Sequence, residues 1–272
     1  MNAHRMRRTP RGRSIIREGS ATIGVGVSDL FSPSLFSAFA AGGVDYGLVD
    51  MEHTSFSYRD VAALVTSARA AELPVIVRPP ELSRSAVGRV LDLGADGILV
   101  PRIESSEDAT AAVRFAKYRP LGERGDDGRI AAISEFEDPR PLIDVVNRNT
   151  VVIALVETRD GVDNIDNINS TPGIDGVWIG PADLVLSFDA PGDIGGPAYR
   201  TAENRILDSC RAHGMPFAIG AASTPDAAIE QIQLGCFTVV ADDEVILLVR
   251  ALSDYVRAVH EGLGRQARAG AR

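Results

Sequence analysis

The stretch Val177-Trp178-Ile179-Gly180-Pro181-Ala182-Asp183-Leu184 has the pattern of a buried strand whose carboxyl end carries a carboxylate. The stretch Leu155-Val156-Glu157-Thr158 has the same pattern further upstream. Short, continuous apolar runs are typical of strands that are buried on both faces, as in parallel sheets. Parallel strands bring their carboxyl ends to one edge, where α/β folds bind ligands. Glu157 and Asp183 are therefore expected to lie together at that edge.

The alternation of a short apolar run and an amphipathic helix continues in both directions along the chain. Helix-stop signals come directly before strands at Gly94-Ala95-Asp96-Gly97 and at Leu234-Gly235-Cys236. We expect strands at residues 22–27, 46–50, 75–78, 97–101, 151–157, 176–180, 216–220 and 237–241, and helices at residues 34–41, 58–71, 83–93, 106–116, 161–169, 198–213, 225–234 and 243–261. Eight such units in roughly 240 residues predict a single-domain (β/α)8 TIM barrel of the α/β class. A doubly wound dinucleotide-binding sheet is the weaker alternative, because no GxGxxG fingerprint follows any strand.

The amino-acid composition indicates which classes of binding partner this protein can have. Hydrophobic residues make up 45% and charged residues 24% of the 272 residues, which is ordinary for a globular domain. The net charge of −9 disfavours nucleic acid, and no apolar run reaches the length of a membrane span. Cys210 and Cys236 are the only cysteines and lack metal-binding spacing, so buried structural thiols in a reducing compartment are expected. These features predict a cytoplasmic protein with neither nucleic acid nor membrane as a partner.

Arginines crowd the amino end of the chain, at positions 5, 7, 8, 11, 13 and 17. No apolar segment follows Arg7-Arg8, so a twin-arginine export signal is rejected. We expect a disordered basic tail at residues 1–19, the barrel at residues 20–262, and a second disordered tail at residues 263–272. The connection at residues 117–140 is too long for an ordinary loop and is predicted to be functional or mobile.

Polar side chains gather where the second to sixth strands are expected to end. Glu157 and Asp183 offer the hard oxygen ligands that Mg²⁺ and Mn²⁺ prefer, although two carboxylates at a barrel rim are also typical of salt bridges. His53 is a candidate base, whereas a single histidine at a strand end is more often structural. Arg78 is placed either to stabilise an oxyanion or to form a rim ion pair. The backbone that follows Gly180 opens a helix and offers N–H groups to an anion.

Taken together, these residues resemble the HpcH/HpaI family of class II pyruvate aldolases over residues 24–259. The motifs that carry the resemblance are, in chain order, Val49-Asp50-Met51-Glu52-His53, Val77-Arg78-Pro79, Leu91-Asp92 with Gly94-Ala95, Leu99-Val100-Pro101, Gly122-Glu123-Arg124-Gly125, Val156-Glu157-Thr158 and Ile179-Gly180-Pro181-Ala182-Asp183-Leu184. One such motif is weak evidence. Their shared order on the expected strands is specific.

The resemblance implies a metal-dependent lyase that cleaves a 4-hydroxy-2-oxo acid into pyruvate, or a related 2-oxo acid, and an aldehyde. It implies that Glu157 and Asp183 hold Mg²⁺ or Mn²⁺, which the oxo acid chelates, so that an enolate forms without a Schiff base. Arg78 would steady the enolate oxygen, and His53, oriented by Asp92, would assist proton transfer. The substrate-binding residues that it implies are Gly180, Pro181, Ala182, Asp183, Arg102, Leu155 and Arg124.

The resemblance also implies a homo-oligomer, a hexamer or a trimer, in which carboxyl-terminal helices exchange between subunits. The apolar run at residues 245–249 is compatible with this exchange and equally with a helix that packs on its own barrel.

Several positions differ from the family pattern. Leu155 replaces a glutamine that is common in relatives, and Arg102 replaces an apolar residue. The stretch Asp126-Asp127-Gly128 replaces an apolar-glycine pair. The metal and enolate groups are thus retained while the aldehyde side differs. Two alternatives stay open: use of the same enolate for C–C bond formation or oxaloacetate decarboxylation, and a non-catalytic barrel that binds a metal–oxoacid complex.

Overall fold

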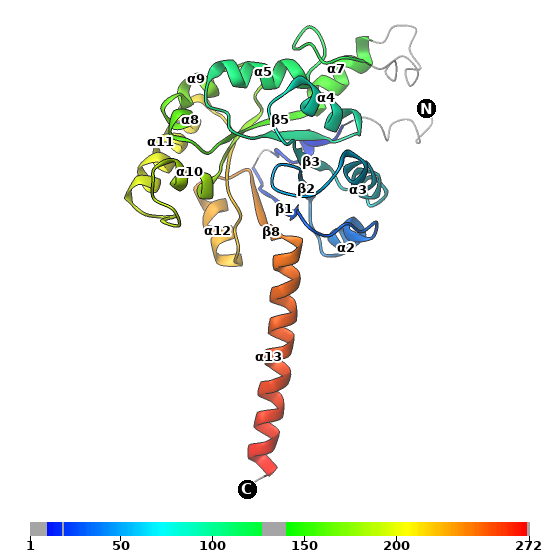
Figure 1. Cartoon of the computed structure of the whole chain (residues 1–272), viewed down its shortest axis with the longest axis vertical. Helices are drawn as coiled ribbons and strands as arrows, with labels where there is room; N and C mark the ends of the chain where they lie inside the picture. Colours follow the sequence, from blue (N-terminus) through cyan, green and yellow to red (C-terminus); the bar gives the residue numbers. More distant parts are fainter. Residues whose placement is uncertain (1–9, 18, 127–139, 271–272) are drawn as a thin grey trace.

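Eight parallel strands form the centre of the molecule in the computed structural model, which describes residues 10–17, 19–126 and 140–270 (Figure 1). The strands are β1 (Thr22–Val27), β2 (Tyr46–Asp50), β3 (Val75–Arg78), β4 (Gly97–Val100), β5 (Val151–Val156), β6 (Gly176–Ile179), β7 (Phe217–Ile219) and β8 (Thr238–Asp243). Each strand from β1 to β6 pairs with the next, and β8 pairs with β1. Ala221 and Val240 bridge the remaining gap between β7 and β8. The expected (β/α)8 barrel is therefore confirmed.

The described part of the chain also contains helices, most of which follow a strand and cover the outside of the barrel (Figure 1). They are the short η1 (Gly12–Ser14), α2 (Leu35–Ala41), α3 (Tyr58–Ala70), α4 (Arg84–Asp92), α5 (Ser106–Ala116), α7 (Arg140–Asn149), α8 (Arg159–Asp163), α9 (Ile165–Asn169), α10 (Pro181–Ser187), α11 (Pro197–His213), α12 (Pro225–Leu234) and α13 (Glu244–Gly270). Five of them begin directly after a Ser or Thr whose hydroxyl accepts the N–H three residues on: Ser57, Ser83, Ser105, Thr158 and Thr224. Each such cap contributes about 1 kcal/mol and fixes the turn between a strand end and its helix.

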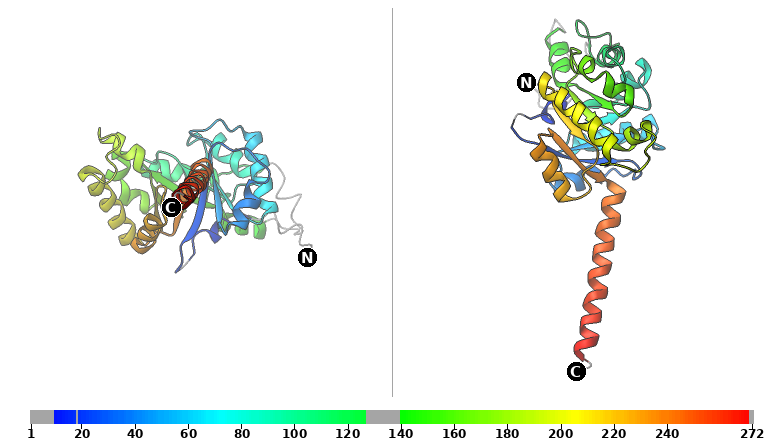
Figure 2. Two further views of the ribbon diagram at one scale, coloured as in Figure 1. Left: turned by 90° about the horizontal axis from the view of Figure 1, so that it is seen from below. Right: turned by 90° about the vertical axis from the view of Figure 1, so that its left-hand side faces the viewer.

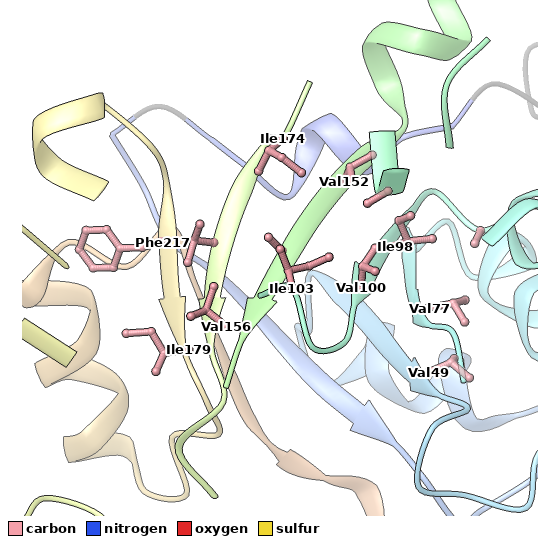
Figure 3. Close-up of a cluster of buried hydrophobic side chains, with 14 of the residues drawn as sticks. Val49, Val77, Ile98, Val100, Ile103, Val152, Val156, Ile174, Ile179 and Phe217 are labelled. Atoms are coloured by element: carbon pink, nitrogen blue, oxygen red, sulfur yellow. The ribbon is translucent and has the colours of Figure 1, made fainter. Parts of the chain in front are cut away.

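Two apolar layers hold the barrel together. The outer layer lies between the strands and the helices and includes Val49, Val77 and Val100 (Figure 3). The inner layer fills the barrel with Tyr46, Ile76, Leu99, Val151, Ile153, Leu155, Trp178, Ala218, Phe237 and Val240. Successive strand residues alternate between the layers, as Val152 (outer) and Ile153 (inner) do. Both faces of each strand are thus apolar, which explains the continuous apolar runs in the sequence.

The segment at residues 10–17 closes the floor of the barrel, where the strands begin. Ile15 is only 1% exposed and belongs to the inner layer. Asp96 accepts hydrogen bonds from the N–H groups of Arg11, at 2.7 Å, and of Val75, at 2.8 Å. Arg13 pairs with Asp175 at 2.7 Å. The structure differs here from the expected disordered tail, because aspartates that precede strands give the arginines specific partners; residues 1–9 and 18 lie outside the described residues.

Two helices depart from the sequence-based expectation. The helix α7 begins at Arg140, where an irregular connection was expected to end; residues 127–139 lie outside the described residues. The helix α13 continues to Gly270, beyond the expected end at residue 261 and into the expected tail at residues 263–272, because residues 265–269 (Arg-Gln-Ala-Arg-Ala) all favour helices, in contrast to Gly262 and Gly264. It projects away from the barrel as a single rod (Figures 1 and 2). Within the described ranges, no helix, α13 included, is long and apolar enough to cross a membrane.

Candidate active site

A cavity of about 300 Å³ opens at the carboxyl ends of the strands. This volume lies at the lower end of the range of ligand pockets in proteins. Its lining residues are Gly26, Leu48, Asp50, His53, Arg78, Leu99, Leu155, Glu157, Trp178, Ile179, Gly180, Pro181, Ala182, Asp183, Gly220, Ala221, Val240 and Asp243. The cavity therefore brings together the ends of all the strands that the sequence marks as chemically important.

Glu157 follows β5 and is only 3% exposed. Its Oε1 accepts a hydrogen bond from the N–H of Arg102 at 2.9 Å. Burial is the main reason that the pKa of Glu157 is raised to about 7; the Arg102 hydrogen bond and the charge of Arg78 lower it, and the nearby charges of Glu52 and Asp183 raise it. A side chain at Gly180 would stand 2.8 Å from Oε2 of Glu157, so only glycine leaves room for this carboxylate. The negative charge of the Glu157 carboxylate is therefore only partly balanced by the positive groups around it.

Arg78 is held rigidly at the end of β3. Asp50 lies opposite Arg78 in the register of β2 and β3, and its carboxylate accepts two hydrogen bonds from the guanidinium, at 2.7 and 2.8 Å. Burial opposes ionisation of Asp50, but these hydrogen bonds and the charge of Arg78 outweigh it and lower the pKa of Asp50. Asp50 also accepts the N–H of Glu52 at 2.9 Å, so it fixes the turn after β2. Asp50 is a functional residue that was not selected from the sequence, although it begins the Asp-Met-Glu-His motif.

Glu52 is the second residue that the sequence-based selection missed. Its Oε2 is buried and accepts no hydrogen bond, and it lies 3.3 Å from Nη1 of Arg78 and 3.7 Å from Nε2 of His53. Burial raises the pKa of Glu52, and the charge of Asp183 raises it as well. Glu52, Glu157 and Asp183 therefore repel one another around a cavity that contains one arginine.

This set of donors fits a divalent cation of the Mg²⁺ type. A cation between Glu157 and Asp183 would neutralise the charge that Arg78 leaves unbalanced. Among the residues that the structure describes, no three His, Cys, Asp or Glu side chains form a closed ligand set. Mg²⁺ commonly takes one or two carboxylates from the protein and keeps its other positions for water and substrate. Two carboxylates beside an open cavity are compatible with that preference.

The turn at Gly180 provides the expected N–H groups. The helix α10 begins at Pro181, which has no N–H, and no side chain caps it. The amides of Ala182 and Asp183 stand in the first turn, where N–H groups lack partners within the helix, and both residues line the cavity. This turn can therefore bind a carboxylate close to the proposed cation ligands.

His53 lines the cavity, but Asp92 does not. The side chain of His53 is 60% exposed, and its charged neighbour is Glu52. Asp92 ends α4, which runs back from the cavity rim to the floor, and it pairs there with Arg124 at 2.8 Å. The expected contact between Asp92 and His53 is thus not formed within one chain, and Arg124 lies with Asp92 at the opposite end of the barrel from the cavity.

Arg102 and Leu155 contribute differently from each other. Leu155 is buried and forms part of the apolar floor of the cavity beside Trp178. Arg102 adopts a positive φ of 51°, and its N–H binds Glu157. Its side chain is 63% exposed, pairs with Glu104 at 3.0 Å and does not line the cavity. The backbone of Arg102, rather than its charge, reaches the site.

Comparison with known proteins agrees with this geometry. A family model described as HpcH/HpaI aldolase/citrate lyase matches residues 28–238. The chain is 29% identical over 247 residues to 2-keto-3-deoxy-L-rhamnonate aldolase of Escherichia coli O17:K52:H18 (strain UMN026 / ExPEC), covering 91% of this chain and 92% of that protein. It is 30% identical over 241 residues to 2-dehydro-3,6-dideoxy-6-sulfogluconate aldolase of Pseudomonas putida, covering 87% and 92%. A solved HpcH/HpaI aldolase/citrate lyase family protein from Burkholderia cenocepacia J2315 has a TM-score of 0.82 and 34% identity, covering 91% of this chain and 98% of that one.

Proposed function

Because the chain belongs to the HpcH/HpaI aldolase/citrate lyase family, we propose that it is a class II, metal-dependent aldolase that cleaves a 4-hydroxy-2-oxo acid into pyruvate, or a related 2-oxo acid, and an aldehyde. The observation that carries the proposal is the cavity that the buried Glu157 and the partly buried Asp183, two mutually repelling carboxylates, share with the fixed guanidinium of Arg78. Cleavage of the C3–C4 bond leaves an enolate, and positive charge placed beforehand at its oxygen lowers the barrier.

Each group in the cavity has a separate task. Glu157 and Asp183 would hold Mg²⁺ or Mn²⁺, which supplies a Lewis-acid charge beside the 2-oxo group. The amides of Ala182 and Asp183 bind the substrate carboxylate. Arg78, locked by Asp50, presents its guanidinium to the developing oxyanion without having to reorganise.

His53, at the mouth of the cavity, would carry out the proton transfer. Its neighbour within the chain is Glu52, so we assign the orienting role to Glu52 rather than to Asp92. The carboxylate of Glu52 would stabilise the imidazolium that forms when His53 takes a proton from the C4 hydroxyl group.

Exchange of the pyruvate methyl protons with deuterium tests enolate formation without knowledge of the aldehyde. We expect the protein with Mg²⁺ or Mn²⁺ to catalyse this exchange, which NMR follows directly, and Glu157→Gln to abolish it. Glu104→Gln is the matched control, because Glu104 only pairs with the exposed Arg102 side chain. Full metal-dependent turnover by Glu157→Gln would refute the proposal.

We further propose that the enzyme is a homo-oligomer joined through α13. One side of this helix carries Leu248, Val249, Leu252, Val256 and Val259, which are 44–55% exposed in a single chain. From Val249 onward their spacing is three or four residues, and Leu248 lies four residues before Leu252, so they form one apolar stripe. Such a stripe along a helix that leaves its own barrel is suited to a second copy of the chain.

A further inference from the structure

One charged residue of the cavity has no task in the chemistry described above. Five of the six charged residues that line the cavity belong to the enolate site or its proton transfer: Asp50, His53, Arg78, Glu157 and Asp183. The sixth is Asp243, the last residue of β8. Its side chain is reachable from the cavity, since Asp243 is among its exposed lining residues.

A β-bulge directs Asp243 into the cavity. Gly24 pairs with Val240 and Gly26 with Asp243, so β8 advances three residues while β1 advances two. Bulges of this kind occur beside active sites, where they change the direction of a side chain. The carboxylate lies against the backbone of Gly26, where a Cβ atom would stand 1.9 Å from Oδ1 of Asp243. Glycine at position 26 is therefore required for Asp243 to lie where it does.

The residue that follows Asp243 anchors this arrangement. Glu244 is 4% exposed, and its carboxylate accepts the N–H groups of Ser28, Asp29 and Leu30 at 2.6–3.2 Å. These bonds tie the end of β8 to the loop after β1. The position of Asp243 is thus fixed before any ligand binds.

Asp243 has no cationic partner among the residues that the structure describes. Its neighbour Asp242 points elsewhere and pairs with Arg250 at 2.7 Å. Burial raises the pKa of Asp243, as do the charges of Glu244, Asp242 and Asp50, whereas a hydrogen bond from the Ser28 side chain lowers it. A carboxylate in this setting gains from a hydroxyl donor, because a hydrogen bond restores part of the lost solvation.

Asp243 lies on the side of the cavity toward which the aldehyde half of a substrate would extend. The strand β1, against which it packs, is four strands away from β5 in the barrel and hence faces Glu157 across the mouth. The lining also contains the apolar residues Leu48, Val240 and Ala221, and Asp50, whose charge acts on Asp243, is already paired with Arg78. A substrate whose oxo-acid end is held at Glu157 thus extends its aldehyde half toward Asp243.

We propose that Asp243 binds a hydroxyl group on the aldehyde half of the substrate, and that the natural aldehyde therefore carries a hydroxyl group. This inference rests on the proposed aldolase function and adds the identity of the aldehyde partner. Asp243 acts as a specificity residue, since it touches the substrate away from the bond that breaks. An unhydroxylated aldehyde would displace water from this carboxylate without offering it a hydrogen bond in return.

The test compares two aldehydes that differ by one hydroxyl group, glycolaldehyde and acetaldehyde, in condensation with pyruvate by the metal-loaded enzyme. We expect the wild type to prefer glycolaldehyde in kcat/KM by about tenfold or more, and Asp243→Ala to reduce this ratio to about one. Asp243→Asn keeps an acceptor without the charge and should give an intermediate ratio. Asp242→Ala is the matched control and should leave the ratio within about twofold of the wild type.

Exchange of the pyruvate methyl protons distinguishes a wrong assignment of Asp243 from a wrong assignment of the aldolase function. The Asp243 variants should retain exchange within about twofold, which also shows that they fold and bind the metal. If Asp243→Ala lowers exchange as much as condensation, or leaves the aldehyde ratio unchanged, the assignment of Asp243 is wrong while the aldolase function stands. Absence of exchange in the wild type would instead overturn the proposed function itself.

Discussion

Glu157 and Arg78 line one cavity in which carboxylates outnumber cations, and their positions determine which charges a ligand meets there. The pKa of the Glu157 carboxyl group is about 7, because burial and neighbouring carboxylates oppose its ionisation. Arg78 avoids a comparable cost by pairing with Asp50. A cation binding beside Glu157 would remove the repulsion, so metal binding and the ionisation of this residue are coupled.

The first prediction concerns this coupling. Because the metal must displace the proton of Glu157, apparent Mn²⁺ affinity should fall by about tenfold between pH 8 and pH 6, across the pKa of about 7. The sign follows from the raised pKa: the metal-free protein holds a proton at pH 6 that it lacks at pH 8. Titration calorimetry of the metal at several pH values measures this slope. A pH-independent affinity would show that Glu157 is not a ligand.

The two-pronged contact between Arg78 and Asp50 is the basis of the second prediction. Arg78→Lys keeps the charge but loses the two-pronged bond to Asp50, so kcat/KM for aldol condensation should fall by about a hundredfold. Arg102→Lys is the control, since its charged end is exposed and only its N–H reaches Glu157; about twofold is the largest change expected. Equal losses in the two variants would contradict the assignment of Arg78.

At the scale of the elements, the amino-terminal segment stabilises the barrel floor rather than forming a free tail. Ile15 inserts into the inner layer beside Tyr46 and Val151. We expect Ile15→Ala to lower the free energy of unfolding by about 2–5 kcal/mol, as for other buried large-to-small changes. Urea denaturation measures this loss. Ile23→Ala removes the same atoms from a residue that is 45% exposed and should cost about 1 kcal/mol or less; similar losses in both would exclude the floor role.

The strands were predictable because parallel strands buried on both faces read as unbroken apolar runs, and the family resemblance and carbon–carbon lyase function inferred from their ends are confirmed. The contacts of Ile15 and Arg13 could not be predicted, because Ile15 packs on apolar residues, and Arg13 pairs with an aspartate, that lie far along the chain. Asp243 was overlooked for a similar reason. Its direction depends on a bulge in the pairing of β1 and β8, which leaves no local signal in the sequence.

At the scale of the whole molecule, α13 is the feature that a single chain cannot explain. Within the described residues its outer part contacts no other element closely enough to cover its apolar stripe, and it points away from the barrel (Figure 2). An exposed apolar stripe of this length is costly in water, so a second copy of the chain is the partner we expect. The active-site cavity lies on the end of the barrel from which α13 departs, since α13 follows directly on Asp243.

The last prediction follows from this position. The double substitution Leu252→Glu and Val256→Glu places two charges in the stripe and should convert the oligomer into monomers, which light scattering after size-exclusion chromatography would detect. Ser253→Glu adds a charge beside the stripe and should leave the mass unchanged. Because the barrel keeps its own core, circular dichroism should show the double variant still folded. If both variants keep the wild-type mass, α13 does not join the subunits; a wild type that is already monomeric would refute the homo-oligomer itself.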